Sequence, residues 1–184
     1  MRVLVAFFTL FSLSMPVVPV FADPPKPVVT HVGGTVQGRE ARIHFHLENA
    51  FSPEMIESLK SGVEISFHIS VEVERIHRNW FDVMIGDYQY IQSIRYDVLS
   101  KVYQLRYPGG EEILPDLQQA LDRMTVFQAT VPLSVEVTRG KLYRAGVRVR
   151  LNRAGLSEPI RSVVFFSSIW DVETNWGRGP VTAP

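Results

Sequence analysis

Apolar and polar side chains alternate with a period of two over several stretches of the chain, most clearly from Val63 to Val73. Within that stretch every second residue is apolar, and the residues between are glutamate, serine or histidine. This pattern is typical of a β-strand with one face on a core and the other in water. Similar patterns, separated by turn residues, predict further strands over Val28–Val36, Glu40–Leu47, Tyr88–Val98, Val102–Tyr107, Thr125–Val137 and Leu142–Leu151.

Two segments change to a helical period. Ser52 and Pro53 suit the N-cap and the first position of a helix that ends near Gly62. A second helix is predicted from Leu114 to Met124, where leucines recur at spacings of three and four. The short apolar run Ser162–Phe166 suits a strand or a helix equally.

Strands dominate this reading, and hairpins join them. The sequence therefore predicts a mainly β domain, an antiparallel β-sandwich that is immunoglobulin-like in general architecture and carries two short inserted helices.

Residues 1–22 have the three parts of a secretory signal peptide. Arg2 supplies positive charge, Val3–Met15 is largely apolar, and Val20-Phe21-Ala22 places aliphatic or small side chains before the predicted cleavage site after Ala22. The apolar run is shorter than the ~20 residues of a membrane-spanning helix. We therefore expect a periplasmic protein without a membrane span after signal cleavage.

The remaining chain divides into three predicted parts. Residues 23–27 form a proline-rich spacer. Residues 28–176 form a single β-rich domain. Residues 177–184 are predicted to be a disordered C-terminal tail.

Composition narrows the possible functions. The chain has 184 residues, no cysteine and a formal net charge of zero. The lack of cysteine excludes disulfides, thiolate metal sites, cysteine nucleophiles and a lipidated cysteine. Zero net charge gives the whole chain no electrostatic attraction to nucleic acid or to an anionic membrane surface. Nucleophile, P-loop and dinucleotide motifs are absent from the sequence, so we expect neither an enzyme nor a cofactor.

Three histidines are candidate metal ligands. His44 and His46 share the polar face of one predicted strand, and His68 lies on the polar face of another. If those strands were neighbours in the right register, the imidazoles would converge on zinc or copper. The alternative is that alternation simply places polar residues on a solvated sheet face.

Four aromatic residues form the candidate binding patch. Trp80 and Phe81 follow the longest alternating strand, whereas Trp170 and Trp176 lie near the C-terminus. Tryptophan is enriched at the centres of protein interfaces. The alternative is that these rings seal the open ends of the sandwich.

Short motifs occur in a fixed order along nearly all of the predicted mature chain: Phe45–Glu54, Leu59–Val63, Trp80-Phe81-Asp82, the tyrosine-containing hairpin Ile94–Leu105, and Ser168–Asp171 followed by Trp176. In this order they resemble the bacterial exported family called domain of unknown function 4390. The resemblance implies a Gram-negative envelope protein. It brings no assigned activity and no catalytic residues.

Three functions remain, in order of preference. The first is a non-enzymatic module that binds an envelope protein, through the Trp80 region or an unpaired edge strand. The second is a carrier of an apolar ligand held between sheet and helices. The third is a metal-binding protein that uses the three histidines. The sequence identifies no individual partner.

Overall fold

The computed structural model describes residues 25–152 and 172–183. The predicted signal peptide, the run Ser162–Phe166 and Trp170 lie outside the described residues. No helix in the described ranges is long and apolar enough to cross a membrane.

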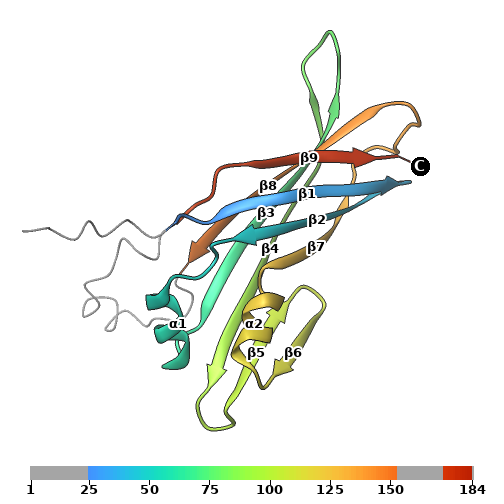
Figure 1. Ribbon diagram of the computed structural model, residues 1–184. Coiled ribbons are helices and arrows are strands. Elements are labelled where there is room, and N and C mark those ends of the chain that lie inside the picture. Colours follow the sequence, from blue (N-terminus) through green and yellow to red (C-terminus); the bar gives the residue numbers. More distant parts are fainter. Residues whose placement is uncertain (1–24, 153–171, 184) are drawn as a thin grey trace, which may run out of the picture.

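The described chain is mainly β, with nine strands and two helices (Figure 1). In chain order they are β1 (Val28–Gln37), β2 (Glu40–Glu48), α1 (Pro53–Lys60), β3 (Ile65–Ile76), β4 (Val83–Asp97), β5 (Val102–Tyr107), β6 (Gly110–Leu114), α2 (Leu117–Arg123), β7 (Val126–Pro132), β8 (Leu142–Asn152) and β9 (Gly177–Thr182). All seven strands that alternation predicts are therefore confirmed, with shifted ends.

All nine strands belong to one open sheet, in the order β6-β5-β4-β3-β8-β9-β1-β2-β7. Neighbouring strands are antiparallel except for β1 and β9, which are parallel. The expected sandwich of two sheets, with an immunoglobulin-like architecture, is not confirmed. Strand twist and the bulges in β1 and β4 let a single sheet bend strongly instead.

The sheet curls around one hydrophobic core. Phe127 of β7 stacks on Phe45 of β2, with ring centroids 4.7 Å apart, and meets Phe67 of β3 edge to face at 6.3 Å. Four strands separate β3 from β7 in the sheet order, so this contact joins opposite halves of the sheet. All three rings are at most 1% exposed.

Both helices begin at side-chain caps. Ser52 Oγ accepts a hydrogen bond from the Met55 N–H at the start of α1 (3.3 Å), as the sequence predicts. The second helix is shorter than expected, because Asp116 caps it by accepting from the Gln119 N–H (2.9 Å). Leu114 consequently ends a strand and does not begin the helix.

The expectation of a disordered tail is wrong for residues 177–182, which form β9 between β8 and β1. The position of β9 requires the glycines of this segment. A Cβ at Gly179 would overlap the backbone carbonyl oxygen of Val32, and one at Gly177 would lie 2.6 Å from Val29 Cγ1. Glycine in a strand often marks such a close approach of another backbone.

Candidate functional site: an open seam between β4 and β7

Three strand edges lack a neighbouring strand in the described part of the chain: the outer edge of β6, which pairs only with β5, part of β4, and β7. β4 pairs with β3 along most of its length, but only Ser93–Asp97 pairs with β5 on the other side. This leaves the edge of residues 83–92 open. β7 ends the sheet order and pairs only with β2.

The curl of the sheet brings the edges of β4 and β7 face to face. The Ser134 N–H, just after β7, donates to the Ile85 carbonyl of β4 (2.7 Å), and a Cβ on Gly86 would touch Val131 and Leu133. The strand directions around the sheet make β4 and β7 antiparallel to each other. We call the opening between residues 83–92 and β7 the seam: it is closed at Ile85.

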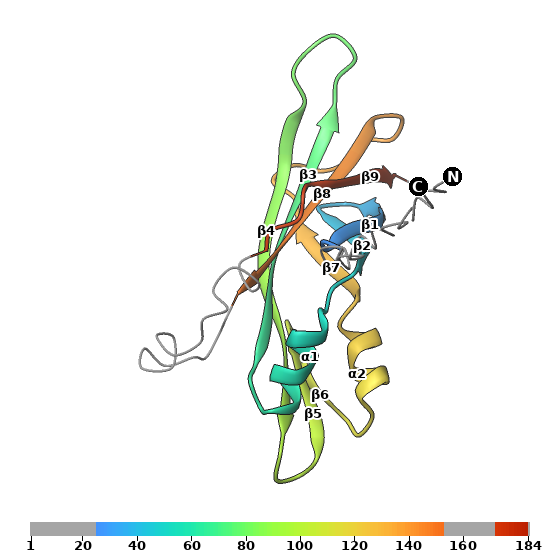
Figure 2. The same cartoon turned by 60° about the vertical axis from the view of Figure 1, so that its left-hand side comes forward.

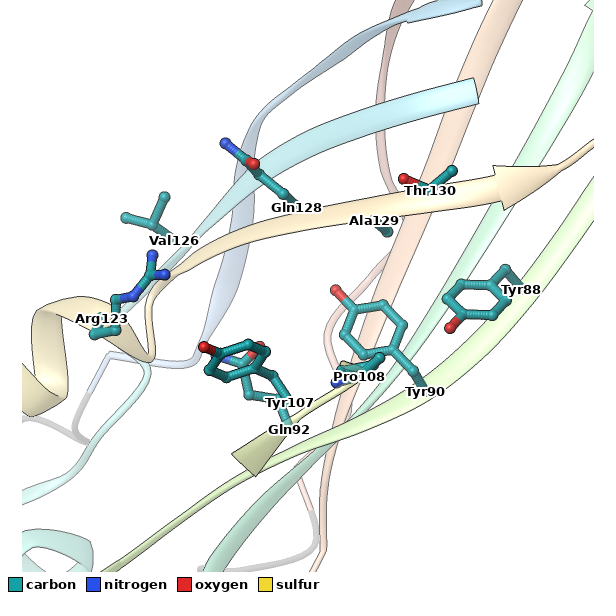
Figure 3. Close-up of a pocket in the computed structure, with 10 residues that line it drawn as sticks. All are labelled: Tyr88, Tyr90, Gln92, Tyr107, Pro108, Arg123, Val126, Gln128, Ala129 and Thr130. Atoms are coloured by element: carbon teal, nitrogen blue, oxygen red, sulfur yellow. The ribbon is translucent and has the colours of Figure 1, made fainter. Parts of the chain in front are cut away.

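Toward α2 the seam contains a hollow of about 400 Å³. Figure 3 shows side chains from β4 and β7 on its two sides, with Tyr107 and Pro108 below and Arg123 at the α2 end. Ten residues line it: Tyr88, Tyr90, Gln92, Tyr107, Pro108, Arg123, Val126, Gln128, Ala129 and Thr130. Tyr88, Tyr90 and Gln92 occupy alternate positions of β4 and therefore share its inner face.

Tyr90 buries a hydroxyl group in this hollow. The residue is 8% exposed, its ring stacks on Tyr88 at 5.6 Å, and its Oη has no hydrogen-bond partner among the described residues. Burial, with a smaller contribution from Tyr88, raises the pKa of Tyr90 above its ordinary value. The phenol therefore keeps its proton at neutral pH and can donate a hydrogen bond.

Gln92 is the second buried polar group. It is 7% exposed, and its side-chain nitrogen donates to Met124 Sδ at 3.5 Å. A thioether sulfur is a weak acceptor. Tyr90 and Gln92 thus present two polar groups to the hollow whose hydrogen-bonding capacity a ligand would satisfy better.

Among the described residues that line the hollow, Arg123 is the one that is charged. Its Nε donates to Glu112 Oε2 at 2.9 Å, and this hydrogen bond raises the pKa of Arg123. The described lining of the hollow therefore combines aromatic rings, neutral polar groups and one cation, and none of these residues is a carboxylate.

β7 has a hollow on its other side as well. A depression of about 450 Å³ over β1 and β2 shares Gln128, Ala129 and Thr130 with the first hollow. Its remaining lining residues are Gly34, Thr35, Arg42, Ile43 and His44. The middle of β7 is consequently approachable from both sides of the strand.

The three candidate metal ligands do not converge. His44 and His46 project from β2 and His68 from β3, and β8, β9 and β1 lie between those strands. Four interstrand steps of ~4.8 Å amount to ~19 Å along the sheet. Within residues 25–152 and 172–183 no group of three or more histidine, aspartate or glutamate side chains is placed to hold a metal ion. The expectation assumed neighbouring strands, which the sheet order contradicts.

The four candidate aromatics do not form one patch. Trp80 and Phe81 lie together in the β3–β4 turn, 76% and 83% exposed, with ring centroids 6.1 Å apart. Trp176 instead packs over Gly146 of β8, beneath the Arg148 guanidinium at 4.7 Å. Gly146 pairs with Glu72, which lies four residues before the end of β3. Trp176 is therefore ~13 Å along the strand from the point where the turn with Trp80 begins. Trp170 lies outside the described residues.

The seam residues are not among the sequence-based candidates. Alternation places Tyr90 and Gln92 on an inner face, but it does not tell which strand edges stay unpaired. The available signal is Gln92 itself, a polar residue at an inward position of a strand where Ile94 and Tyr96 follow.

Comparison with known proteins gives one match. A family model described as Domain of unknown function (DUF4390) matches residues 26–178. No curated protein and no solved structure matches this chain.

Proposed function

This chain belongs to the DUF4390 family, and we propose that it is an exported, non-enzymatic protein that binds an extended segment of a partner protein along the seam. The signal-peptide pattern of residues 1–22 supports export to the periplasm of a Gram-negative bacterium. Cleavage after Ala22 then releases the mature protein.

The open edges of β4 and β7 carry this proposal. Exposed strand edges present rows of N–H and C=O groups that pair readily with another extended chain. The two edges run in opposite directions and converge at Ile85. A segment that adds to either edge therefore lies within reach of side chains from the other.

The lining of the hollow favours a peptide over an apolar ligand. Tyr88 to Gln92 spans ~14 Å of strand, the length of about four residues of an extended segment. Along that length the hollow offers the Tyr90 hydroxyl and the Gln92 amide, which suit the backbone carbonyls and amides of a peptide. The apolar-ligand carrier remains the second candidate, because the tyrosine rings also supply apolar surface.

Site-specific photo-crosslinking tests the proposal. A photoreactive amino acid replaces Gln128, which is exposed at the seam, and in the control Gln89, which is exposed on the outer face of β4. In cells of the source bacterium, position 128 should crosslink to one discrete protein and position 89 should not. The crosslinked peptide, once sequenced and synthesised, should protect the amides of β4 and β7 from hydrogen exchange.

Equal crosslinking from both positions would contradict a seam-specific partner. So would a crosslinked peptide that protects amides elsewhere in the sheet and leaves those two edges unchanged.

A further inference from the structure

The β3–β4 hairpin carries an exposed aromatic tip. Residues 77–82 connect the two strands, and the hairpin extends beyond the rest of the sheet at the top of Figures 1 and 2. Trp80 and Phe81 are more exposed than most apolar residues, at 76% and 83%, and Met84 at the start of β4 is 52% exposed. Such rings on a protruding tip contribute little to the core.

The two acidic side chains nearest the hairpin tip, Glu74 and Asp82, share one arginine. Arg144 of β8 donates to Glu74 at 2.7 Å and to Asp82 at 2.8 Å. The other charged residues between positions 74 and 84 are Arg75 and Arg78. The part of the hairpin nearest Trp80 therefore has a positive charge excess.

The neighbouring turn adds to this excess. Leu142 of β8 pairs with Ile76 at the end of β3, which places the β7–β8 turn beside the base of the hairpin tip. That connection contains Arg139, Lys141 and Glu136, so it contributes one further net positive charge. The zero net charge of the whole chain thus conceals a basic end of the molecule.

We infer that this end of the molecule docks on an anionic lipid bilayer, with Trp80 and Phe81 in the headgroup interface and the basic residues against the lipid phosphates. Tryptophan favours the membrane–water interface, and arginine and lysine add attraction to anionic lipids. A bilayer also deforms around a small convex tip, whereas a protein partner would need a matching pocket of sufficient area.

This docking surface is separate from the seam. Arg123 and the hollow lie toward α2, on the far side of the closure at Ile85 from the hairpin tip. The lipid contact therefore leaves the proposed peptide-binding edges accessible, and its failure would not affect the proposed function.

Vesicle co-sedimentation of the purified protein tests the inference. The probes are vesicles of phosphatidylcholine alone and of phosphatidylcholine with one quarter phosphatidylglycerol. We expect binding to the anionic vesicles that weakens at high salt. The double variant Trp80→Ala, Phe81→Ala should bind at least tenfold more weakly, and Arg78→Gln about fivefold more weakly.

Leu99→Ala is the matched control. Leu99 lies in the β4–β5 turn at the other end of the same strand and is 94% exposed, so it is an accessible apolar side chain in a turn where Asp97 balances the charge of Lys101. This variant should bind like the unmodified protein. Circular dichroism confirms that each variant is folded, as expected for exposed positions.

Three outcomes would overturn the inference: no binding to anionic vesicles, equal binding to neutral vesicles, or full binding by the Trp80/Phe81 variant.

Discussion

At the scale of single residues, two buried tyrosines differ in how their hydroxyl groups are satisfied. Tyr143, 5% exposed, accepts a hydrogen bond from the Thr138 N–H (2.8 Å), whereas the Tyr90 hydroxyl has no partner in the described residues. A buried polar atom without a partner costs free energy on folding, and a satisfied one contributes to stability. The unpartnered Tyr90 hydroxyl lowers stability in the free protein, and a hydrogen bond to a bound peptide would offset that cost.

This difference predicts opposite effects for the same substitution. Tyr143→Phe should lower the free energy of unfolding by ~1–2 kcal/mol, because it leaves the Thr138 N–H without its acceptor. Tyr90→Phe should leave that free energy unchanged or raise it by up to ~1 kcal/mol, since it removes an unsatisfied group. Urea unfolding followed by circular dichroism measures both.

The two variants should differ in the opposite way when binding of the partner peptide to the seam is measured. Tyr90→Phe should weaken binding about fivefold, the loss of one hydrogen bond, while Tyr143→Phe should bind normally under conditions where it is folded. If Tyr90→Phe destabilised the protein as much as Tyr143→Phe, the Tyr90 hydroxyl would have a structural partner and its proposed role would be lost.

At the scale of elements, the sequence predicts a strand well where one of its faces is apolar. It predicts a strand poorly where contacts between backbones determine that the segment is extended. β2, β3 and β8 alternate clearly because one face lies on the core. β6 follows Pro108-Gly109, which breaks the pattern, and its polar residues Glu111 and Glu112 give no apolar face. β9 is glycine-rich because of its closeness to β1 at Val32, a contact that no local pattern reveals.

The fit of β9 predicts a strong effect for a small substitution. Gly179→Ala should lower the free energy of unfolding by ~3 kcal/mol, because the added methyl group meets the Val32 backbone, which cannot rotate away. Gly110→Ala in β6 is the control: there the nearest atoms belong to the Tyr107 ring, at 3.3 Å, in an exposed position, and a change below ~1 kcal/mol is expected. Thermal and urea unfolding measure both. Similar losses for the two variants would show that β9 tolerates a side chain at Gly179.

At the scale of the whole molecule, the mainly β class follows from alternation, but the seam does not. The location of an unpaired edge depends on the order of strands in the sheet, and contacts such as Phe67 with Phe127 join residues sixty positions apart in sequence. The same order explains why His44 and His68 were expected together and are separate. Alternation assigns a residue to a face, and the topology decides which faces meet.

The proposed export concerns the whole chain and has its own test. Protein recovered from the periplasmic fraction should begin at Asp23, because cleavage is predicted after Ala22. N-terminal sequencing or intact mass measurement checks this. Changing Ala22 to a bulky residue such as Phe should block cleavage and leave the uncleaved chain in the membrane fraction. A mature protein that still begins at Met1 would contradict the predicted signal peptide.

The position of β9 also governs when the molecule can assume its final form. Among the described strands, only β9 hydrogen-bonds to both β8 and β1, so it joins the half of the sheet around β3 to the half around β2. It is also the last of the nine strands to leave the ribosome. Until β9 has emerged, the two halves lack the strand that pairs them into one continuous sheet. If the proposed export takes place through a channel that admits only an extended chain, the protein could stay extended over nearly its whole length. The sheet would then be completed only when transport is complete, because both depend on the arrival of β9.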